Sequence, residues 1–112
     1  MQAKKVDVNQ PEILTQARSL GISVQSLHII GKDCPDVLFG YAGINILAEV
    51  KSGKNDLSEG QKIYHDNWKG QICTIRNIDD LIREILSYSN GMWSTIQLLD
   101  LWSKYIELIS NE

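Results

Sequence analysis

Two apolar segments that lie close together in the chain, residues 37–39 and 44–50, constrain the fold more than any other feature. Residues 40–43, Gly-Tyr-Ala-Gly, separate them, and two apolar runs joined by such a breaker are typical of a β-hairpin. Three charged residues, Asp36, Glu49 and Lys51, lie inside or at the ends of these apolar strands. We therefore expect a hairpin of buried strands that carries charged side chains near one end.

The alternation of side chains along a strand decides which face these charges share. Successive residues point to opposite faces, so Glu49 and Lys51 project together, with roots about 6.6 Å apart. A two-residue turn at residues 41–42, or a four-residue loop over residues 40–43, would place Asp36 opposite Leu47 and on the face of Glu49, at the diagonal separation of about 7–8 Å. Two carboxylates at that separation can share a hard cation such as Mg²⁺. The hairpin therefore predicts a metal site, on the condition that its register has this parity.

Local patterns predict the other elements of an α/β fold. Asn9 and Ser58 each precede a Glu or Gln by three residues, which indicates helices over about residues 9–20 and 58–68. Residues 22–30, which include His28, and residues 71–75 are expected to be strands. Asn77 is expected to cap a helix over residues 78–86. A strand, a helix and a strand in this order predict a right-handed crossover, with the last strand parallel to the Glu49 strand.

The C-terminal part is expected to add one more helix. Asn90-Gly91 breaks the chain, and Ser94 with Gln97 is a helix start signal that follows Trp93. The apolar stripe of this helix must be buried, either on its own sheet or against another subunit; its residues are Leu98, Leu99, Trp102, Tyr105, Ile106 and Ile109. We expect a core over residues 1–90 and an amphipathic helix over residues 91–112, and we hypothesise that this helix forms a homodimer contact.

Composition sets the class of protein. The 112 residues suffice for one domain with its own core. No apolar run approaches the length of a membrane span and the first residues lack a secretory apolar region, so we expect a cytoplasmic protein with no membrane partner. Cys34 and Cys73 are expected to be free thiols, and with His28 and His65 they lack the spacing of a zinc site.

The charge balance weighs against a nucleic-acid partner. The formal net charge is -3, whereas affinity for nucleic acids depends largely on cations that neutralise phosphates. An acidic monomer is therefore expected to show only weak non-specific binding of nucleic acid, unless its lysines cluster or a partner supplies positive charge.

Several short motifs in order resemble a nuclease family. Pro35-Asp36 before the hairpin turn and Glu49-Val50-Lys51 after it resemble the signature of the PD-(D/E)XK nuclease superfamily. With residues 57–61, Leu-Ser-Glu-Gly-Gln, at the start of the next helix, they resemble the small VRR-NUC type domains of that superfamily. The Holliday-junction resolvases of archaea belong to the same superfamily. The resemblance covers about residues 7–86.

The resemblance implies a fold, an activity and a set of roles. The implied fold is a restriction-endonuclease-like αβββαβ core with a four-stranded mixed sheet flanked by helices, to which this chain adds a C-terminal helix. The implied activity is Mg²⁺-dependent cleavage of DNA, with Mn²⁺ as a substitute, on branched DNA in recombination or repair, in a setting of phage or prophage type. The implied metal ligands are Glu12, Asp36, Glu49 and the carbonyl of Val50. Lys51 would orient the attacking water, and Gln61 would position water or a phosphate.

The same residues also have structural interpretations. Glu12 and Gln61 each stand three residues after a helix-capping residue, where a capping box uses them. Glu49 and Lys51 could pair with each other, which would leave Asp36 without a partner. Tyr64 and Trp68 favour a core or interface position over base stacking. A non-catalytic adaptor that keeps the nuclease fold is therefore the alternative function, and binding of Mg²⁺ or Mn²⁺ would separate the two.

Overall fold

The computed structural model describes residues 7–89 and 95–111 of the chain. Its elements, in chain order, are α1 (Gln10–Ser19), β1 (Ser23–Ser26), the short 3₁₀ helix η1 (His28–Ile30), β2 (Val37–Tyr41), β3 (Ile44–Val50), α2 (Glu59–Asn67), β4 (Ile72–Ile75), α3 (Ile78–Ser89) and α4 (Thr95–Ser110). The predicted start of the last helix at Ser94, the break at Asn90-Gly91 and Trp93 lie outside the described residues. Each of the other predicted helices is present.

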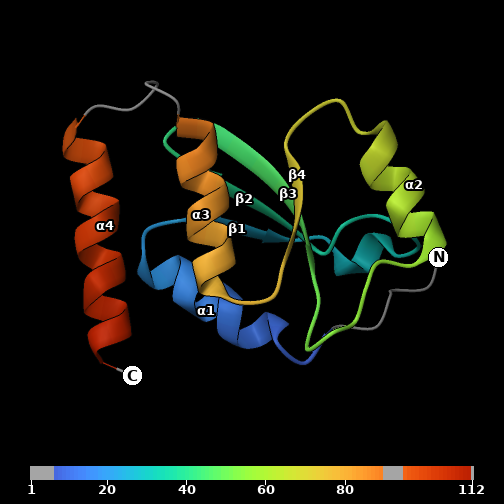
Figure 1. Ribbon diagram of the computed structural model, residues 1–112, viewed down its shortest axis with the longest axis horizontal. Helices are drawn as coiled ribbons and strands as arrows, with labels where there is room; N and C mark the ends of the chain where they lie inside the picture. The colour runs from blue at the N-terminus through green and yellow to red at the C-terminus, as the bar shows by residue number, and fades with distance from the viewer. Residues whose placement is uncertain (1–6, 90–94, 112) are drawn as a thin grey trace.

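The strands form one four-stranded mixed sheet in the order β1-β2-β3-β4. β1, β2 and β3 pair antiparallel, whereas β3 and β4 pair parallel, with Leu47 opposite Ile72 and Val50 opposite Ile75. α2 lies in the connection between the two parallel strands (Figure 1). The α/β class, the mixed sheet and the parallel last strand are therefore confirmed.

The register of the hairpin differs from the predicted one by two residues. Tyr41 pairs with Ile44 and Val37 pairs with Ala48, so the two-residue turn is Ala42-Gly43 and not Tyr41-Ala42. Both turn residues have positive φ, 50° at Ala42 and 83° at Gly43, which is the conformation that a two-residue hairpin turn requires. The predicted turn is wrong, but a shift of two residues keeps every side chain on its predicted face.

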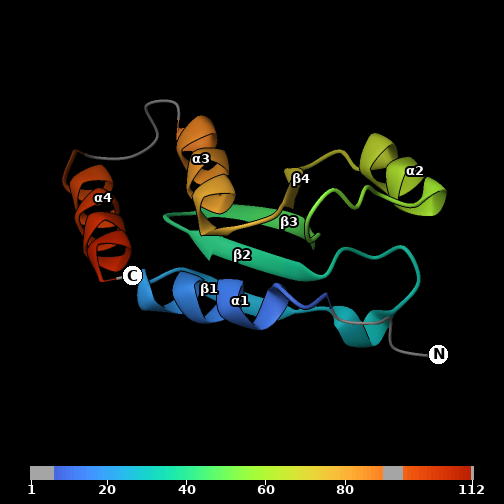
Figure 2. The ribbon, with the colours of Figure 1, turned by 60° about the horizontal axis from the view of Figure 1, so that its bottom comes forward.

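The hydrophobic core lies on one face of the sheet. α1 and α3 contact each other and both pack on the strands (Figures 1 and 2). The strand residues beneath them are buried and alternate along β2 and β3; they are Val37, Phe39, Ile44, Ile46, Ala48 and Val50. The intervening residues of the same strands point to the other face, which carries Leu38 and Leu47 as well as the polar Asn45 and Glu49.

The first strand is shorter than predicted. β1 ends at Ser26, and His28 lies in the 3₁₀ helix η1 instead of the strand predicted over residues 22–30. The Ser26 hydroxyl and His28 Nδ1 are 2.7 Å apart, and the N–H of Ile30 donates to the carbonyl of Leu27. These local bonds turn the chain before the strand can continue.

α4 has two apolar faces, and only one of them packs on the core. Leu101 is 1% exposed, and the Tyr105 hydroxyl donates to Asp79 of α3. The other face leaves large apolar side chains exposed; they are Ile96, Leu99, Trp102, Ile106 and Ile109. The single stripe predicted for this helix is therefore wrong, because its members divide between the two faces.

Two further expectations concern the whole chain. Cys34 and Cys73 are free thiols, as predicted, and burial raises the pKa of the Cys73 thiol to about 12. Among the described residues, no helix has the length and apolar character needed to cross a membrane.

Candidate functional site

Two carboxylates, Asp36 and Glu49, are buried at one end of the β2–β3 hairpin. They are 2% and 1% exposed, respectively. Asp36 Oδ2 accepts a hydrogen bond from the backbone N–H of Val50, with an N to O distance of 2.7 Å. Since Val50 follows Glu49 in β3, this bond holds the Asp36 carboxylate beside the strand position that carries Glu49. Carboxylates are seldom buried this completely unless charge or hydrogen bonds compensate the lost hydration.

The hairpin register explains why these two side chains meet. The last strand pair joins Val37 to Ala48, so the same register continued by one residue places Asp36 directly across from Glu49. Directly opposite residues have Cα atoms about 4.5–5.5 Å apart, which is closer than the diagonal arrangement expected from the sequence. Both side chains lie on the face that α1 and α3 leave uncovered.

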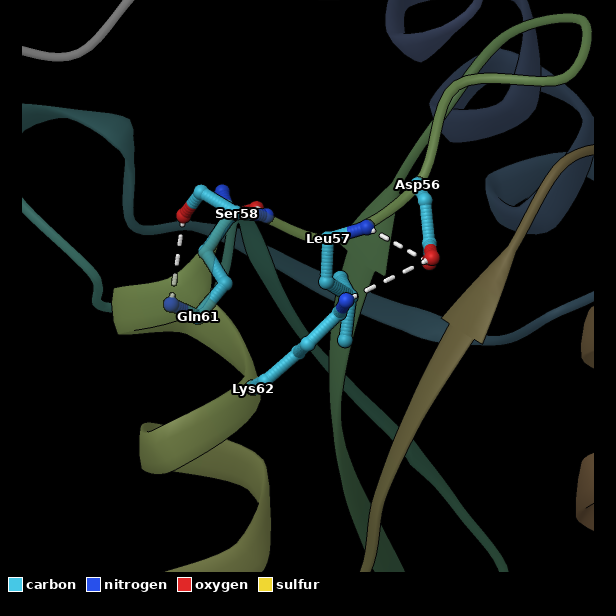
Figure 3. Close-up of polar contacts among 5 residues, drawn as sticks. All are labelled: Asp56, Leu57, Ser58, Gln61 and Lys62. Atoms are coloured by element: carbon cyan, nitrogen blue, oxygen red, sulfur yellow. Dashed lines mark hydrogen bonds and ion pairs between the residues drawn. The ribbon is translucent and has the colours of Figure 1, made fainter.

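Gln61 of α2 connects the next element to Glu49. Its Nε2 donates to Glu49 Oε1 over 2.9 Å, while its Oε1 accepts the N–H of Ser58 over 2.8 Å. The N–H of Gln61 donates in turn to the Ser58 hydroxyl (Figure 3), which completes the capping box. Because the cap occupies the amide oxygen, the amide nitrogen is the end that faces Glu49. The capping and site interpretations of Gln61 are thus compatible.

The segment before α2 is fixed by a second set of bonds. Asp56 accepts the N–H of Leu57 over 2.7 Å, and its carboxylate lies 3.7 Å from the Lys62 ammonium (Figure 3). The backbone hydrogen bond from Leu57, followed by the charge of Lys62, lowers the pKa of Asp56. The first turn of α2 also packs closely on the loop after η1, because a methyl group at Gly60 would overlap the Asp33 carboxylate. These contacts set where Gln61 lies.

Lys51 and the Val50 carbonyl lie beside the carboxylate pair. Lys51 follows β3, and its N–H donates to Ile75 of β4. Within residues 7–89 and 95–111 its ammonium forms no ion pair, so the structural alternative in which it pairs with Glu49 is not observed. The N–H and C=O of a strand residue point to the same neighbouring strand. Since the N–H of Val50 reaches Asp36, its carbonyl points toward the same side of β3.

Glu12 does not join the carboxylate pair. It is exposed on α1 and lines a pocket with Arg76 and Asp79 at the start of α3. Among the described residues, no third Asp, Glu, His or Cys gathers with Asp36 and Glu49 into a metal-binding group. In this structure Glu12 therefore lies apart from the carboxylate pair, and its role as a metal ligand stays a prediction.

Asn9 holds the N-cap position of α1, as predicted, but its side chain contacts groups that are distant in the chain and that gave no local signal. Its backbone is helical and its side chain makes no capping bond. Instead its amide nitrogen donates to the carbonyls of Lys51 and Arg76, over 3.0 and 3.2 Å. Asp7 takes over the local role, since its Oδ1 accepts the N–H of Asn9. Asn9 thus ties the start of α1 to the ends of β3 and β4.

Gln10 is the buried polar residue on α1 that sequence reasoning missed. It is as buried as the apolar residues that follow it, and its Oε1 has no hydrogen-bond partner among the described residues. The signal was present, because residues 10, 13, 14 and 17 have the spacing of one helix face. A polar residue at the head of an apolar stripe was the feature to notice.

The donor set fits a hard divalent cation. Mg²⁺ is usually held by one or two carboxylates together with waters and phosphates, and Asp36 and Glu49 supply two carboxylates on one face of the sheet. Close burial of two negative charges is unfavourable, and a cation between them would remove that cost. No protein-family model, curated protein or solved structure matches this chain.

Proposed function

We propose that the protein is a metal-dependent nuclease that hydrolyses DNA phosphodiester bonds. The observation that carries the proposal is the pair of buried carboxylates, Asp36 and Glu49, on one face of the hairpin. An amide side chain on a separate helix holds one of them in place. Burying two like charges together costs stability, and a functional cation is a reason to keep them.

Each residue of the site has a distinct task in this proposal. A bound Mg²⁺ ion would polarise the phosphate and activate a water molecule. Gln61 fixes the orientation of Glu49 through its amide nitrogen. Lys51, which makes no ion pair within the described residues, places a positive charge near the scissile phosphate and stabilises charge that develops in the transition state.

The substrate that we favour is branched DNA, cut in the manner of a resolvase. The resemblance of residues 7–86 to the VRR-NUC and archaeal resolvase domains supports this choice. One site of this kind cuts one strand, so paired cuts require two sites related by symmetry. The exposed apolar face of α4 is the surface that we propose for the second copy.

Cleavage assays test the nuclease directly. End-labelled four-way junction, flap, linear duplex and single-stranded DNA are incubated with Mg²⁺ or Mn²⁺, using wild type and Glu49→Gln. The matched control is Glu107→Gln, which removes an exposed carboxylate from α4. We expect Glu49→Gln to lower the rate at least about a hundredfold and Glu107→Gln to cut like wild type. If Glu49→Gln cuts as fast as wild type, the assignment of the site is wrong.

The adaptor is the second candidate, and the net charge of -3 favours it. Calorimetric titration with Mn²⁺ separates the two functions, because an adaptor has no need to bind a cation. A nuclease should bind Mn²⁺, and Asp36→Asn should abolish that heat while the far-ultraviolet circular dichroism spectrum stays unchanged. A folded wild-type protein that neither binds Mn²⁺ nor cuts any of the four substrates would establish the adaptor.

A further inference from the structure

A groove runs along the face of the sheet that carries the two carboxylates. Leu38 and Leu47 line it, Tyr64 of α2 and Trp68, which caps the C-terminus of α2, form one wall, and Lys69 follows them. Its volume is about 840 Å³, which exceeds the space that a single nucleotide needs. We refer to these five residues and the space between them as the sheet groove.

The sheet groove begins next to the carboxylate pair. Leu38 lies two residues after Asp36, and Leu47 lies two residues before Glu49, so each leucine shares a face with its carboxylate. Two residues of strand span about 6.6 Å. α2 also runs from the carboxylate pair to the sheet groove. Gln61 contacts Glu49, and Trp68 follows seven residues later, which corresponds to about 10 Å along a helix.

The aromatic wall has the features of a stacking platform. Trp68 is 44% exposed, and the rings of Tyr64 and Trp68 are nearly parallel, at 12°, with centroids 5.7 Å apart. Because Trp68 is partly exposed, part of its ring is available to a second flat ring, beside the indole nitrogen that packs near Gly70. Exposed aromatic side chains of this kind bind single-stranded nucleic acids by stacking on the bases.

The charges around the platform select the ligand. Lys69 is the one charged residue among the described residues that line the sheet groove, and no carboxylate lines it. The pocket on the other side of Tyr64 and Trp68 contains the Asp33 carboxylate instead, which would repel a phosphate. Although the whole chain is acidic, a DNA strand in the sheet groove would therefore meet the positive charge of Lys69 and no carboxylate. Asn45 and Gln71, which also line it, supply amides that can bond to base edges.

We propose that the sheet groove binds an unpaired DNA strand and stacks one of its bases on Trp68. This inference rests on the proposed nuclease function, because it defines how the substrate approaches Asp36 and Glu49. A stacked strand advances about 3.4 Å per nucleotide, so a base on Trp68 lies about three nucleotides from a phosphate at Glu49. A base pair inside a duplex cannot present its face in this way, so the groove selects DNA with a single-stranded segment beside the cut.

The test measures binding without cleavage. Fluorescence anisotropy follows a labelled 12-nucleotide single strand and a labelled blunt duplex in low salt with EDTA, so the result does not depend on a metal. Trp68→Ala is compared with Ile63→Ala, which removes a 54% exposed apolar side chain of α2 that does not line the sheet groove. Trp68→Phe keeps a stacking ring, and it guards against a folding defect in Trp68→Ala.

We expect Trp68→Ala to weaken single-strand binding about 5- to 100-fold, with Trp68→Phe and Ile63→Ala each within about threefold of wild type. Lys69→Gln should reduce the salt dependence of binding by about one phosphate contact. Equal binding by wild type and Trp68→Ala would overturn the assignment of the sheet groove to DNA. A peptide would then be the ligand to consider for the groove. Cleavage by a wild type that binds no single strand would overturn it as well, and the nuclease proposal would stand.

Discussion

The helices at the two ends of the molecule, α2 and α4, are positioned by different forces. Figures 1 and 2 show them at opposite ends of the molecule, with the sheet between them. α2 is held by directional contacts, which are the capping box at Ser58 and the hydrogen bond from Gln61 to Glu49. α4 is held mainly by apolar packing around Leu101. Directional contacts fix a helix to within the length of a hydrogen bond, whereas apolar contacts tolerate repacking.

This difference matters for function because the proposed site lies at the α2 end. A catalytic group must be held within a fraction of an ångström by the residues around it, and Gln61 meets that requirement through bonds at both ends of its amide. The α4 end needs only to bury apolar area, and five large apolar side chains of α4 remain exposed in a single chain. The end of the molecule that must position a site exactly is therefore not the end that must bury apolar area.

The largest expected effect sharpens the description of α4. Leu101→Ala should lower the free energy of unfolding by about 2–5 kcal/mol, because a buried leucine is replaced by a cavity. Leu99→Ala on the same helix is the matched control, and it should change stability by less than about 0.5 kcal/mol because Leu99 is exposed. Urea unfolding followed by circular dichroism measures both. Equal losses from the two variants would show that α4 does not pack as described.

The next effect tests the close packing at the α2 end. Gly60→Ala should destabilise the protein by about 0.5–1.5 kcal/mol, because the new methyl group forces the exposed Asp33 carboxylate out of its present position. In an Asp33→Ala background the sign should reverse, since alanine is about 0.5–1 kcal/mol better than glycine within a helix. Thermal unfolding of the four proteins completes a double-mutant cycle. An additive cycle would contradict the contact.

Gln61→Glu separates the two tasks of Gln61. Glutamate keeps the capping box but replaces the donor to Glu49 with another carboxylate, so stability should fall by about 1–2 kcal/mol at neutral pH. Repulsion raises the pKa of the carboxylates in the folded state, so the deficit should shrink as the pH falls and they become protonated. Unfolding measured between about pH 7 and pH 4 checks this. A deficit that is independent of pH would argue against the contact with Glu49.

The smallest effect on a single chain concerns the exposed face of α4. The double variant Trp102→Ser with Ile106→Ser should change the stability of a monomer by less than about 0.5 kcal/mol. If this face forms the proposed dimer, wild type should dissociate on dilution in analytical ultracentrifugation, and the double variant should be a monomer at every concentration. Wild type that stays monomeric at the highest concentration would contradict the dimer and leave α4 as a structural cover.

The sequence predicted the contacts that are local and failed on those that are not. Ser58 and Gln61 are three residues apart, so their capping box was visible as a pattern, and it is confirmed. Asn9 carries the same pattern, but its amide reaches carbonyls at Lys51 and Arg76. Those partners are distant in the chain, and no local signal reveals them. The exposure of Glu12 follows from how α1 rotates on the sheet, which is also a non-local property.

Periodicity had a similar limit. The alternation along β3 placed Asp36 and Glu49 on one face correctly, because parity depends only on whether residue numbers are odd or even. The turn itself was misplaced, because Ala42 adopts a positive φ that non-glycine residues seldom show. For α4, the sequence identified apolar residues but not which of two faces each one occupies.

The two-residue turn at Ala42-Gly43 limits how this chain can change in evolution. Asp36 and Glu49 sit on opposite arms of the hairpin, so a single inserted residue in either arm would send one carboxylate into the apolar layer beneath α1 and α3. Insertions in pairs would preserve the site, and a bulge could absorb an odd one. The hairpin should therefore tolerate insertions and deletions mainly when they change its length by an even number of residues. Related chains should differ in hairpin length mainly by two.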